Sequence, residues 1–282
     1  MGPATPADVP AERIVSLAPH LTELVFTAGA GGKLVGVVEY SDFPPEARAL
    51  PRIGDAFRLD FERIAALKPD LVLAWESGNP VRAIERLEEL GLRVIVVGSY
   101  ELADIASGLR MIGRLAGTAA TAEQAAERFE QDIGELIARY ADAPEIAVFY
   151  QISLDPLFTV NGRHLISELL RVCGGRNIFA GLTELAPAVS VEAVLARNPE
   201  MIMTPREGGD EALDFWRRWP DLNAVRANNL VAVDANLVAR ATTRTVQGAV
   251  QICAALDTAR TAKKTANVAS AGFLAGRAAA LP

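Results

Sequence analysis

The chain has 282 residues, of which 50% are hydrophobic, 22% charged and 6% aromatic, a composition that suits a folded protein of one or two domains and excludes disordered, collagen-like and coiled-coil chains. Its 28 Lys and Arg against 35 Asp and Glu give a formal net charge of −7, and the basic residues are scattered, so nucleic acid and anionic membranes are poor partners. No apolar run reaches the ~18 residues that span a bilayer, which predicts a soluble protein.

Short apolar, β-branched segments alternate with helical patterns along the whole chain. The predicted strands cover 13–17, 34–38, 71–75, 93–97, 146–151, 201–204 and 230–234. The predicted helices cover 20–28, 60–67, 81–90, 103–115, 165–172, 191–197, 211–218 and 245–260. This alternation is typical of parallel strands joined by crossover helices, so the predicted fold class is α/β.

The segment 121–140 interrupts this rhythm, because it reads as one amphipathic helix of roughly 30 Å. On either side of it the sequence repeats itself: 60–70 and 190–200 each have a capping residue, an acid two positions later and a proline before a strand. This duplication predicts two Rossmann-like lobes joined by a single long backbone helix, with a ligand cleft between the lobes. The predicted parts of the chain are an N-terminal lobe at 1–118, the connecting helix at 119–143, a C-terminal lobe at 144–260 and a tail at 261–282.

Catalytic motifs are missing from the sequence. There is no Gly-rich dinucleotide or P-loop fingerprint after a strand and no Gly-x-Ser-x-Gly elbow. With only two His and two Cys, a zinc site that takes three or four His, Cys or carboxylate ligands is hard to assemble, so neither a metal site nor a cofactor is predicted. His20 and His164 could act in a chelatase-like enzyme with Glu39 or Glu76, but a surface or capping role is the simpler interpretation of each.

Aromatic, hydroxyl and amide side chains follow several predicted strands. In α/β sheets, ligands bind outside the carboxyl ends of strands, and this mixture suits a flat, partly polar ligand. The residues of this kind that we select as candidate contacts are Tyr40, Ser41, Trp75, Ser77, Gly78, Phe158 and Asn236.

Several stretches together resemble a known family. They are 16–29 (SLAPHLTELVFTAG), 36–46, 59–75, 168–179 and 251–256. The chain resembles the helical-backbone (class III) substrate-binding proteins of ABC importers from about residue 13 to about 257, and within them it is most similar to the periplasmic cobalamin-binding branch. The resemblance implies a binding protein without catalysis that captures cobalamin or a related corrinoid and delivers it to a membrane permease.

The resemblance also assigns a compartment and a covalent link. The N-terminus has no basic and apolar leader, and the resemblance implies a periplasmic protein whose signal peptide has been removed. From the residues alone, Cys173 and Cys253 could be reduced core thiols or one disulfide; the family pattern implies the disulfide. Glu62 and Glu192 match the acidic residues, one per lobe, that contact permease arginines in the family, although helix capping would also explain them.

Candidate ligand residues transfer from the family only in part. Tyr40, Trp75, Phe158 and Arg240 match family contacts. Two expected tryptophans are replaced by Ala56, with Phe57 beside it, and by Ala186, and an expected Asp is Asn236. Losing two indoles removes apolar burial, so we expect a pocket that is wider or shaped for a different chelate.

Two alternatives remain open at this stage. A ferric siderophore or haem is the alternative ligand within the same fold, and Arg58, Arg206 and Arg240 could then face its anionic groups. A chelatase-like enzyme is the alternative of a different class, and it predicts turnover that depends on His20 or His164. The tail at 261–282 lies outside the resemblance, and a helix extension is the simpler interpretation of it.

Overall fold

The computed structural model describes residues 9–98, 100–207 and 209–278, with side chains up to residue 264. The chain divides into two compact units. Unit 1 comprises Met1–Ile133 and Arg240–Thr245, and unit 2 comprises Gly134–Ala239 and Val246–Pro282. The short segment Arg240–Thr245 therefore belongs with the N-terminal part of the chain, a feature that the sequence analysis did not predict.

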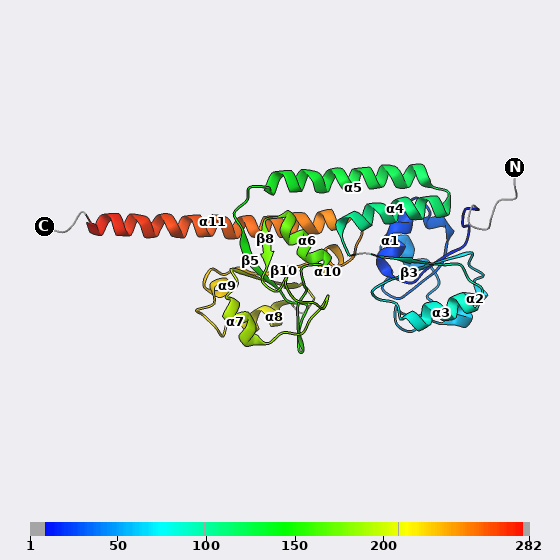
Figure 1. Ribbon diagram of the computed structural model, residues 1–282, viewed down its shortest axis with the longest axis horizontal. Helices are drawn as coiled ribbons and strands as arrows, with labels where there is room; N and C mark the ends of the chain where they lie inside the picture. Colours follow the sequence, from blue (N-terminus) through cyan, green and yellow to red (C-terminus); the bar gives the residue numbers. More distant parts are fainter. Residues whose placement is uncertain (1–8, 99, 208, 279–282) are drawn as a thin grey trace. The chain divides into compact units, whose positions relative to one another are not determined.

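Unit 1 is a parallel sheet with helices on both faces. Its strands are β1 (Ile14–Ser16), β2 (Leu34–Val37), β3 (Leu71–Trp75) and β4 (Val94–Val97), in the order β2-β1-β3-β4. Its helices are α1 (Pro19–Thr27), η1 (Gly31–Lys33), η2 (Pro45–Ala49), α2 (Phe61–Ala66), α3 (Val81–Glu89) and α4 (Leu102–Ala116). Figure 1 shows α1 and α4 on one side of this sheet and α2 and α3 on the other.

One core cluster of unit 1 lies between the sheet and the α2–α3 layer. It includes Val15, Leu17, Val38, Ile53, Ile64, Val72, Ala74 and Leu87, all fully buried. The strands contribute apolar residues to both faces, as expected for a parallel sheet that is covered on each side.

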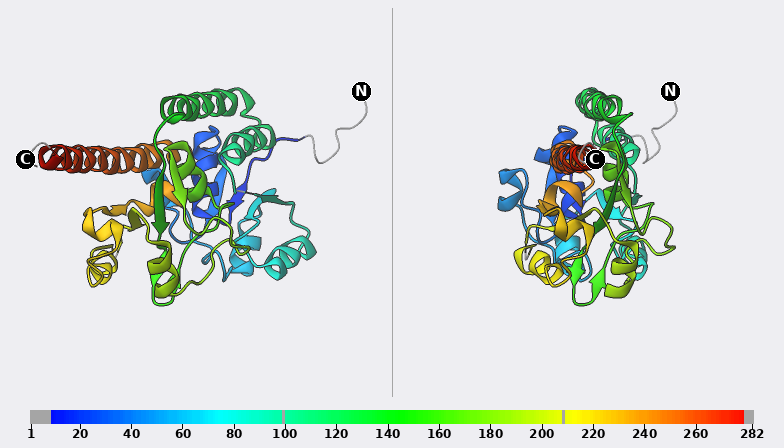
Figure 2. Two further views of the ribbon diagram at one scale, coloured as in Figure 1. Left: turned by 60° about the vertical axis from the view of Figure 1, so that its left-hand side comes forward. Right: turned by 90° about the vertical axis from the view of Figure 1, so that its left-hand side faces the viewer.

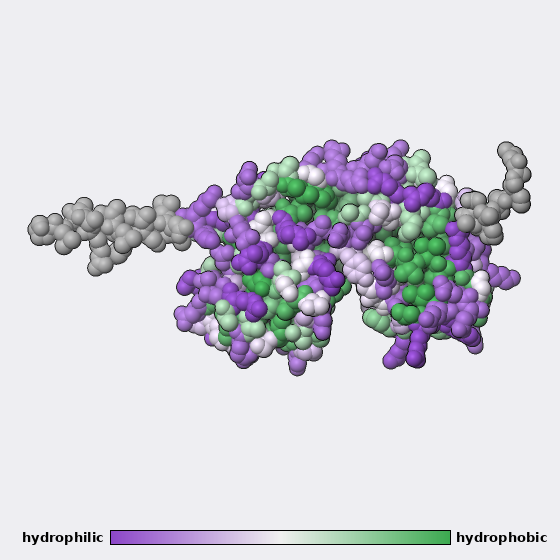
Figure 3. All heavy atoms as spheres, viewed as in Figure 1, coloured by the Kyte–Doolittle hydropathy of each residue, from purple (hydrophilic) through white to green (hydrophobic). Residues whose placement is uncertain are grey.

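Helix α5 (Ala119–Tyr140) contains the boundary between the two units. Its buried residues Ala122, Ala126, Phe129, Ile133 and Leu136 recur at helical spacing. The outward face is hydrophilic in Figure 3. Arg110 of α4 holds the first half of α5 through ion pairs with Glu123 and Glu130. The sequence thus predicted the long amphipathic helix correctly, two residues short at its start.

Unit 2 has a second parallel sheet and a small hairpin. The sheet has the order β10-β9-β5-β8, made of β5 (Ile146–Tyr150), β8 (Gly175–Asn177), β9 (Met201–Pro205) and β10 (Leu230–Val233), while β6 (Ser153–Leu154) and β7 (Leu157–Phe158) pair antiparallel. The helices are α6 (Leu165–Val172), α7 (Val191–Arg197), α8 (Gly209–Trp216), α9 (Asn223–Arg226), α10 (Ala235–Val238) and α11 (Thr245–Ala278). One core cluster joins Phe149 and Ile202 of the sheet to Val194, Trp216 and Ala224 of α7, α8 and α9.

The two sheets have the same topology. Read from the other edge, the second sheet is β8-β5-β9-β10, which matches β2-β1-β3-β4 strand for strand. The repeated helix starts are also equivalent: Asp60 accepts a hydrogen bond from the Arg63 amide before α2, and Ser190 accepts one from the Ala193 amide before α7. These features confirm the predicted fold class of two α/β lobes and the two predicted caps.

The elements that the sequence analysis missed are short or polar. They are β8, the β6–β7 hairpin, α9 and α10. Strand β8 reads Gly-Arg-Asn and has no apolar alternation, so it pairs with β5 through its backbone without an intrinsic strand signal. The last helix was predicted over 245–260 with a helix extension as the simpler interpretation of the tail, and α11 confirms the extension by continuing to Ala278. Helix α11 therefore covers most of the predicted tail, and residues 279–282 lie outside the described residues.

Two links hold α11 to the rest of unit 2. Cys253 forms a disulfide with Cys173 at the end of α6, which confirms the pairing implied by the family resemblance. About two turns later the buried Arg260 donates to the backbone carbonyls of Pro144, Cys173 and Gly174. Beyond these links α11 extends past the sheet of unit 2, as the left view of Figure 2 shows; the right view looks along the helix. None of the helices in the described part of the chain is long and apolar enough to cross a membrane.

Candidate ligand-binding site

Each sheet has a point where the chain reverses its direction of winding. In unit 1 this point lies between β1 and β3, and in unit 2 it lies between the equivalent strands β5 and β9. Loops diverge from the carboxyl ends of such neighbouring strands, which makes a crevice where ligands of α/β proteins bind. The predicted contacts in unit 1 lie around this point.

The indole of Trp75, the last residue of β3, has two close neighbours. Its ring meets the ring of His20 edge-on, with centroids 5.1 Å apart. It also lies close to Gly78, where an added Cβ would come within 1.8 Å of the indole. The predicted pair of Trp75 and Gly78 is therefore in contact, and glycine is required there because any side chain would displace the ring.

His20 is a neutral, buried group. Burial and the nearby positive charge of Arg240 lower the pKa of His20 to about 4, so the imidazole is uncharged at neutral pH. Within the described residues, the Nε2 atom of His20 and the Nε1 atom of Trp75 are buried without a hydrogen-bond partner. His20 thus packs against the tryptophan ring as an uncharged group.

The side chain of Asn79 forms hydrogen bonds to three separate backbone segments, one of them at Trp75 itself. Its side-chain oxygen accepts from the Trp75 amide at 2.6 Å, and its amide nitrogen donates to the carbonyls of Leu17 and Ala56 at 3.1 and 2.8 Å. One buried side chain therefore connects the ends of β1 and β3 to the loop that carries Phe57. The sequence analysis did not select Asn79.

Phe57 and Tyr40 are exposed aromatic residues on neighbouring loops of unit 1. Phe57 is 70% exposed, and its loop is closed by Asp55, whose carboxylate accepts from the amides of Phe57 and Arg58. These hydrogen bonds lower the pKa of Asp55. Tyr40 is 77% exposed and has a φ of +64°, in the left-handed region. Ser77, in the turn after Trp75, is also exposed.

Ser41 differs from the other candidates. Its side chain is fully buried, and its hydroxyl lies 3.2 Å from that of Thr22, which in turn lies 3.0 Å from that of Ser16. This interior network supports the turn that presents Tyr40. A direct ligand contact by the Ser41 side chain is therefore not what the geometry favours.

A cluster of paired charges lies beside Tyr40, all of it within unit 1. Glu23 of α1 has a side chain only 3% exposed, and it binds both Arg240, at 3.1 Å, and Arg244, at 2.7 Å. Arg240 also binds Asp42 at 2.7 Å and donates to the Tyr40 carbonyl at 3.2 Å. Burial raises the pKa of Asp42, but the hydrogen bond and charge of Arg240 outweigh it and lower that pKa overall.

This charge cluster fixes the segment Arg240–Thr245 to unit 1. Leaving Glu23 buried and unpaired would be costly, so both arginines are expected to stay bound to it. Arg244 further packs its guanidinium over the ring of Phe43, 3.9 Å from the centroid. Glu23, Asp42 and Arg244 were missed by sequence reasoning, although Glu23 and His20 are the only ionisable residues of the apolar helix α1, a signal that Glu23 has a buried partner.

The candidates in unit 2 are on separate loops. Phe158 ends the β6–β7 hairpin and is half-buried, and Asn236 lies in α10, whose start is capped by Asp234. At the switch point itself lies Gln151, fully buried, whose side-chain oxygen accepts from the Trp216 indole at 2.6 Å. Its amide nitrogen has no partner among the described residues. Arg206, at the end of β9, is exposed.

The second histidine also has a structural role. His164 precedes α6, and its Nδ1 accepts from the Ile166 amide at 3.1 Å. Burial lowers the pKa of His164 to about 4. No group of three or more His, Cys, Asp or Glu in the described part of the chain could hold a metal ion.

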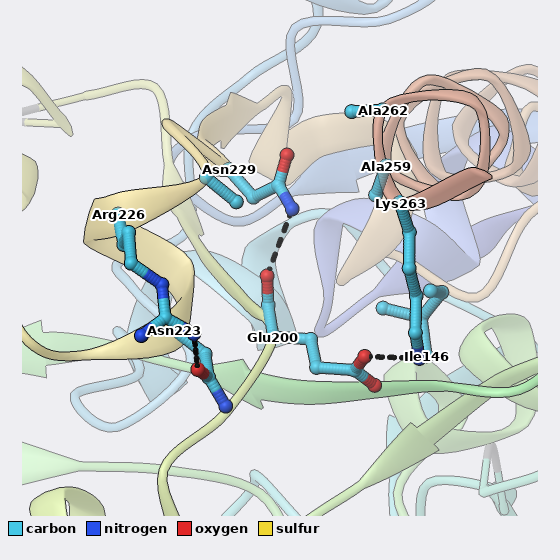
Figure 4. Close-up of a pocket in the computed structure, with 9 residues that line it drawn as sticks. Ile146, Glu200, Asn223, Arg226, Asn229, Ala259, Ala262 and Lys263 are labelled. Atoms are coloured by element: carbon cyan, nitrogen blue, oxygen red, sulfur yellow. Dashed lines mark hydrogen bonds and ion pairs between the residues drawn. The ribbon is translucent and has the colours of Figure 1, made fainter. Parts of the chain in front are cut away.

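A cavity of about 570 Å³ opens on the opposite edge of the unit 2 sheet, where the strands begin (Figure 4). Its lining residues are Ile146, Glu200, Asn223, Arg226, Ala227, Asn229, Ala259, Ala262 and Lys263. The polar groups bind one another: Glu200 accepts from Lys263 at 2.6 Å, and its carbonyl accepts from Asn229. No predicted site residue lines this cavity, so we place the candidate site at the carboxyl edge of the strands.

Comparison with known proteins agrees with this architecture. The family model described as periplasmic binding protein matches residues 14–237. The chain belongs to the periplasmic binding protein family. This confirms the family resemblance that the sequence motifs indicated. The family is named for binding and not for catalysis.

Curated and solved relatives within the periplasmic binding protein family include vitamin B12-binding proteins. That of Vibrio parahaemolyticus is 36% identical over 251 residues, covering 88% of this chain and 90% of the relative, and that of Yersinia pestis is 38% identical over 245 residues, covering 86% and 85%. The crystal structure of the periplasmic vitamin B12 binding protein of Vibrio cholerae matches with a TM-score of 0.84 at 38% identity, covering 89% of this chain and 98% of that one. A periplasmic haem-binding protein of Pseudomonas aeruginosa matches with a TM-score of 0.76 at 27% identity, covering 87% and 92%.

Proposed function

We propose that this chain is the extracytoplasmic substrate-binding protein of an ABC importer, which captures cobalamin or a related corrinoid and delivers it to the membrane permease. The observation that carries the proposal is the rigidly held indole of Trp75 at the switch point of unit 1. Relatives that cover most of the chain are named vitamin B12-binding proteins. The periplasm is the corresponding compartment, and the Cys173–Cys253 disulfide suits its oxidising conditions.

The exposed rings of Tyr40 and Phe57, with the half-buried Trp75, suit a large, flat ligand with a polar rim. Trp75, Phe57 and Tyr40 supply aromatic surface, which contributes most of the apolar burial on binding. Ser77 and the N–H groups of Arg240 supply hydrogen bonds to acceptors on the rim. In unit 2 we propose Phe158 and Asn236 as contacts. That one ligand contacts both units remains a prediction from the sequence.

Haem or a ferric siderophore is the second candidate, and the haem-binding protein of Pseudomonas aeruginosa supports it. Arg58 and Arg206 are exposed and could face anionic groups. Arg240, the third candidate cation, is already neutralised by Glu23 and Asp42. The corrinoid, whose rim is made of neutral carboxamides, therefore fits unit 1 better than an anionic chelate.

We further propose that Glu62 and Glu192 contact the permease. Both are exposed acids in the first turn of equivalent helices, α2 and α7. The local hydrogen bonds of Glu192 lower the pKa of its carboxyl. An acid at each of two equivalent positions is more than capping alone requires, since Asp60 and Ser190 already cap these helices.

Titration of the purified protein with ligands tests the function. Cyanocobalamin, cobinamide, haemin and a ferric hydroxamate would be added in turn, with heat and absorbance recorded. We expect one stoichiometric site for the two corrinoids, no chemical change in either and weaker or no binding of the others. Binding of haemin or the ferric chelate alone would refute the corrinoid assignment and retain the carrier. Conversion of a bound ligand, lost in His20 or His164 variants, would favour the chelatase.

A further inference from the structure

The positive charge of Arg240 is cancelled before any ligand arrives. Its Nη1 atom binds carboxylate oxygens of both Glu23 and Asp42, at 3.1 and 2.7 Å. Arg244 shares Glu23 through two further hydrogen bonds, at 2.8 and 2.7 Å. Two guanidinium groups and two carboxylates therefore form a closed, electrically neutral cluster at the exposed face of unit 1.

Asp42 is the exposed member of this cluster. Its side chain is 49% exposed, against 17% for Arg240 and 3% for Glu23. A ligand group that approaches Arg240 from solvent therefore also approaches the carboxylate of Asp42. The lowered pKa of Asp42 keeps that carboxylate ionised at neutral pH.

Arg240 still has hydrogen-bond donors to offer. A guanidinium carries five N–H bonds, and the cluster uses three of them, two at Nη1 and one from Nη2 to the Tyr40 carbonyl. Among the residues that the structure describes, the Nε hydrogen and the second Nη2 hydrogen have no acceptor. A neutral carbonyl oxygen can accept from these without meeting a like charge, whereas an incoming carboxylate is repelled by Asp42 and finds Arg240 already paired with two carboxylates. The exposed Arg48, whose charge also acts on Asp42, is the same in the wild type and in any Asp42 variant.

We propose that Asp42 is a specificity-determining residue, which by pairing with Arg240 makes unit 1 accept a neutral carboxamide oxygen and discriminate against a ligand that carries a carboxylate there. The inference rests on the proposed binding function. It adds that the ligand is selected by the charge of the rim group that meets Arg240. Glu23 acts differently. It is a positioning residue, because its buried carboxylate pairs with Arg240 inside unit 1.

The test compares ligands that differ by one charge. Cyanocobalamin and its monocarboxylic acids, in each of which one side-chain carboxamide has become a carboxylate, are titrated into the wild type, Asp42→Asn and Asp42→Ser. The ratio of the Kd of the acid to the Kd of the amide measures the discrimination. For at least one isomer, we expect this ratio to fall threefold or more in both variants, and the fall to shrink at high salt. Asn keeps an oxygen that can accept from Arg240, so the Tyr40 loop is retained.

Glu39→Gln is the matched control. It removes the same charge from the same loop, but Glu39 makes no ion pair with any of the described residues. Its ratio should stay at the wild-type value. An unchanged ratio in both Asp42 variants for every isomer, or an equal fall in Glu39→Gln, would overturn the proposal, because discrimination would then not come from the pair with Arg240.

A failure of the proposed function can be told apart from a failure of this inference. If the wild type binds no corrinoid, the corrinoid assignment fails, and haemin with its dimethyl ester becomes the ligand pair. A threefold fall of the acid-to-ester ratio in the Asp42 variants would then support the role of Asp42 for another chelate. An unchanged ratio, or no binding of either porphyrin, would overturn it.

Discussion

At the scale of the residue, the candidate site depends on side chains that are held by others. Trp75 is enclosed by His20 and Gly78, and Asn79 fixes the backbone on which it lies. Binding loses less conformational entropy when such a contact residue is already ordered. The supporting residues are therefore expected to influence affinity without touching the ligand.

Replacing Trp75 by Ala should weaken cobalamin binding by more than tenfold, about 1.4 kcal/mol, because the aromatic surface offered to the ligand is lost. Isothermal titration of the folded variant measures this. Trp75→Phe keeps a flat ring and should lose less than Trp75→Ala. Equal affinities of all three proteins would remove Trp75 from the site.

Gly78→Ala should also weaken binding, because the new Cβ would overlap the indole. The displaced ring should change the tryptophan fluorescence of the free protein, which gives a second readout. Gly134→Ala is the control, since its added Cβ meets open space in α5 and helix propensity favours Ala by about 1 kcal/mol. We expect the control to keep wild-type binding and fluorescence; matching spectra for Gly78→Ala would contradict the packing described.

His20 makes stability depend on pH. Its folded pKa of about 4 lies below the value of 6.5 in an unfolded chain, so the unfolded state takes up the proton first. The contribution of His20 to the free energy of unfolding is complete above pH 6.5 and is lost as the pH falls toward 4. Between pH 7 and pH 5 the free energy of unfolding should fall by about 2 kcal/mol for this reason. Urea unfolding at both pH values should show a smaller loss for His20→Asn than for the wild type. Identical losses would mean that the imidazole is protonated when folded.

At the scale of the element, the two lobes repeat one topological unit, and the sequence shows this through helix starts rather than strands. Asp60 and Ser190 cap equivalent helices, each followed by proline and a central strand. Such signals are local and could be read from the chain. Strand β8 could not, because its three residues are paired only by their neighbour β5.

Helix α11 is the element that depends most on tertiary links. Its disulfide closes a loop of 80 residues, which by the chain-entropy relation stabilises the folded state by about 4 kcal/mol. Reduction, or the double change Cys173→Ala with Cys253→Ala, should lower the free energy of unfolding in urea by roughly this amount. The double variant is the control for the reductant, since its stability should not respond to dithiothreitol. A wild type unaffected by reduction would contradict this role.

At the scale of the whole molecule, the proposed carrier must be recognised by a permease. Exposed ion pairs are typically worth only about 0–1 kcal/mol, so docking through Glu62 and Glu192 should depend on both acids and on salt. We expect Glu62→Gln with Glu192→Gln to reduce delivery to the cognate permease in proteoliposomes several-fold and to leave ligand affinity unchanged. Glu85→Gln, an exposed acid on α3, is the control. Delivery that is insensitive to the double change would exclude these residues as the docking contacts.

The sequence predicted the fold more fully than the site. Alternating apolar segments and capped helices indicated every strand of the two parallel sheets except β8 to within a residue or two, since these signals are local. The family motifs indicated Cys173–Cys253 and the aromatic candidates. Asn79, Glu23 and Asp42 were not identified, because their roles come from partners 4 to 221 residues away in the chain. Ser41 was chosen for its place after a strand, and only burial shows that it faces inward.

The amino-acid sequence by itself determined the α/β class, the duplication and the family, because periodicity, caps and motifs are properties of neighbouring residues. Only the tertiary structure decided which charges are free. Arg240 reads in the sequence as a cation available to a ligand, and in the fold it is bound to Glu23 and Asp42, residues about 200 positions earlier. Electrostatic partners are set by distance in space, and that distance is fixed when the segment Arg240–Thr245 packs into unit 1.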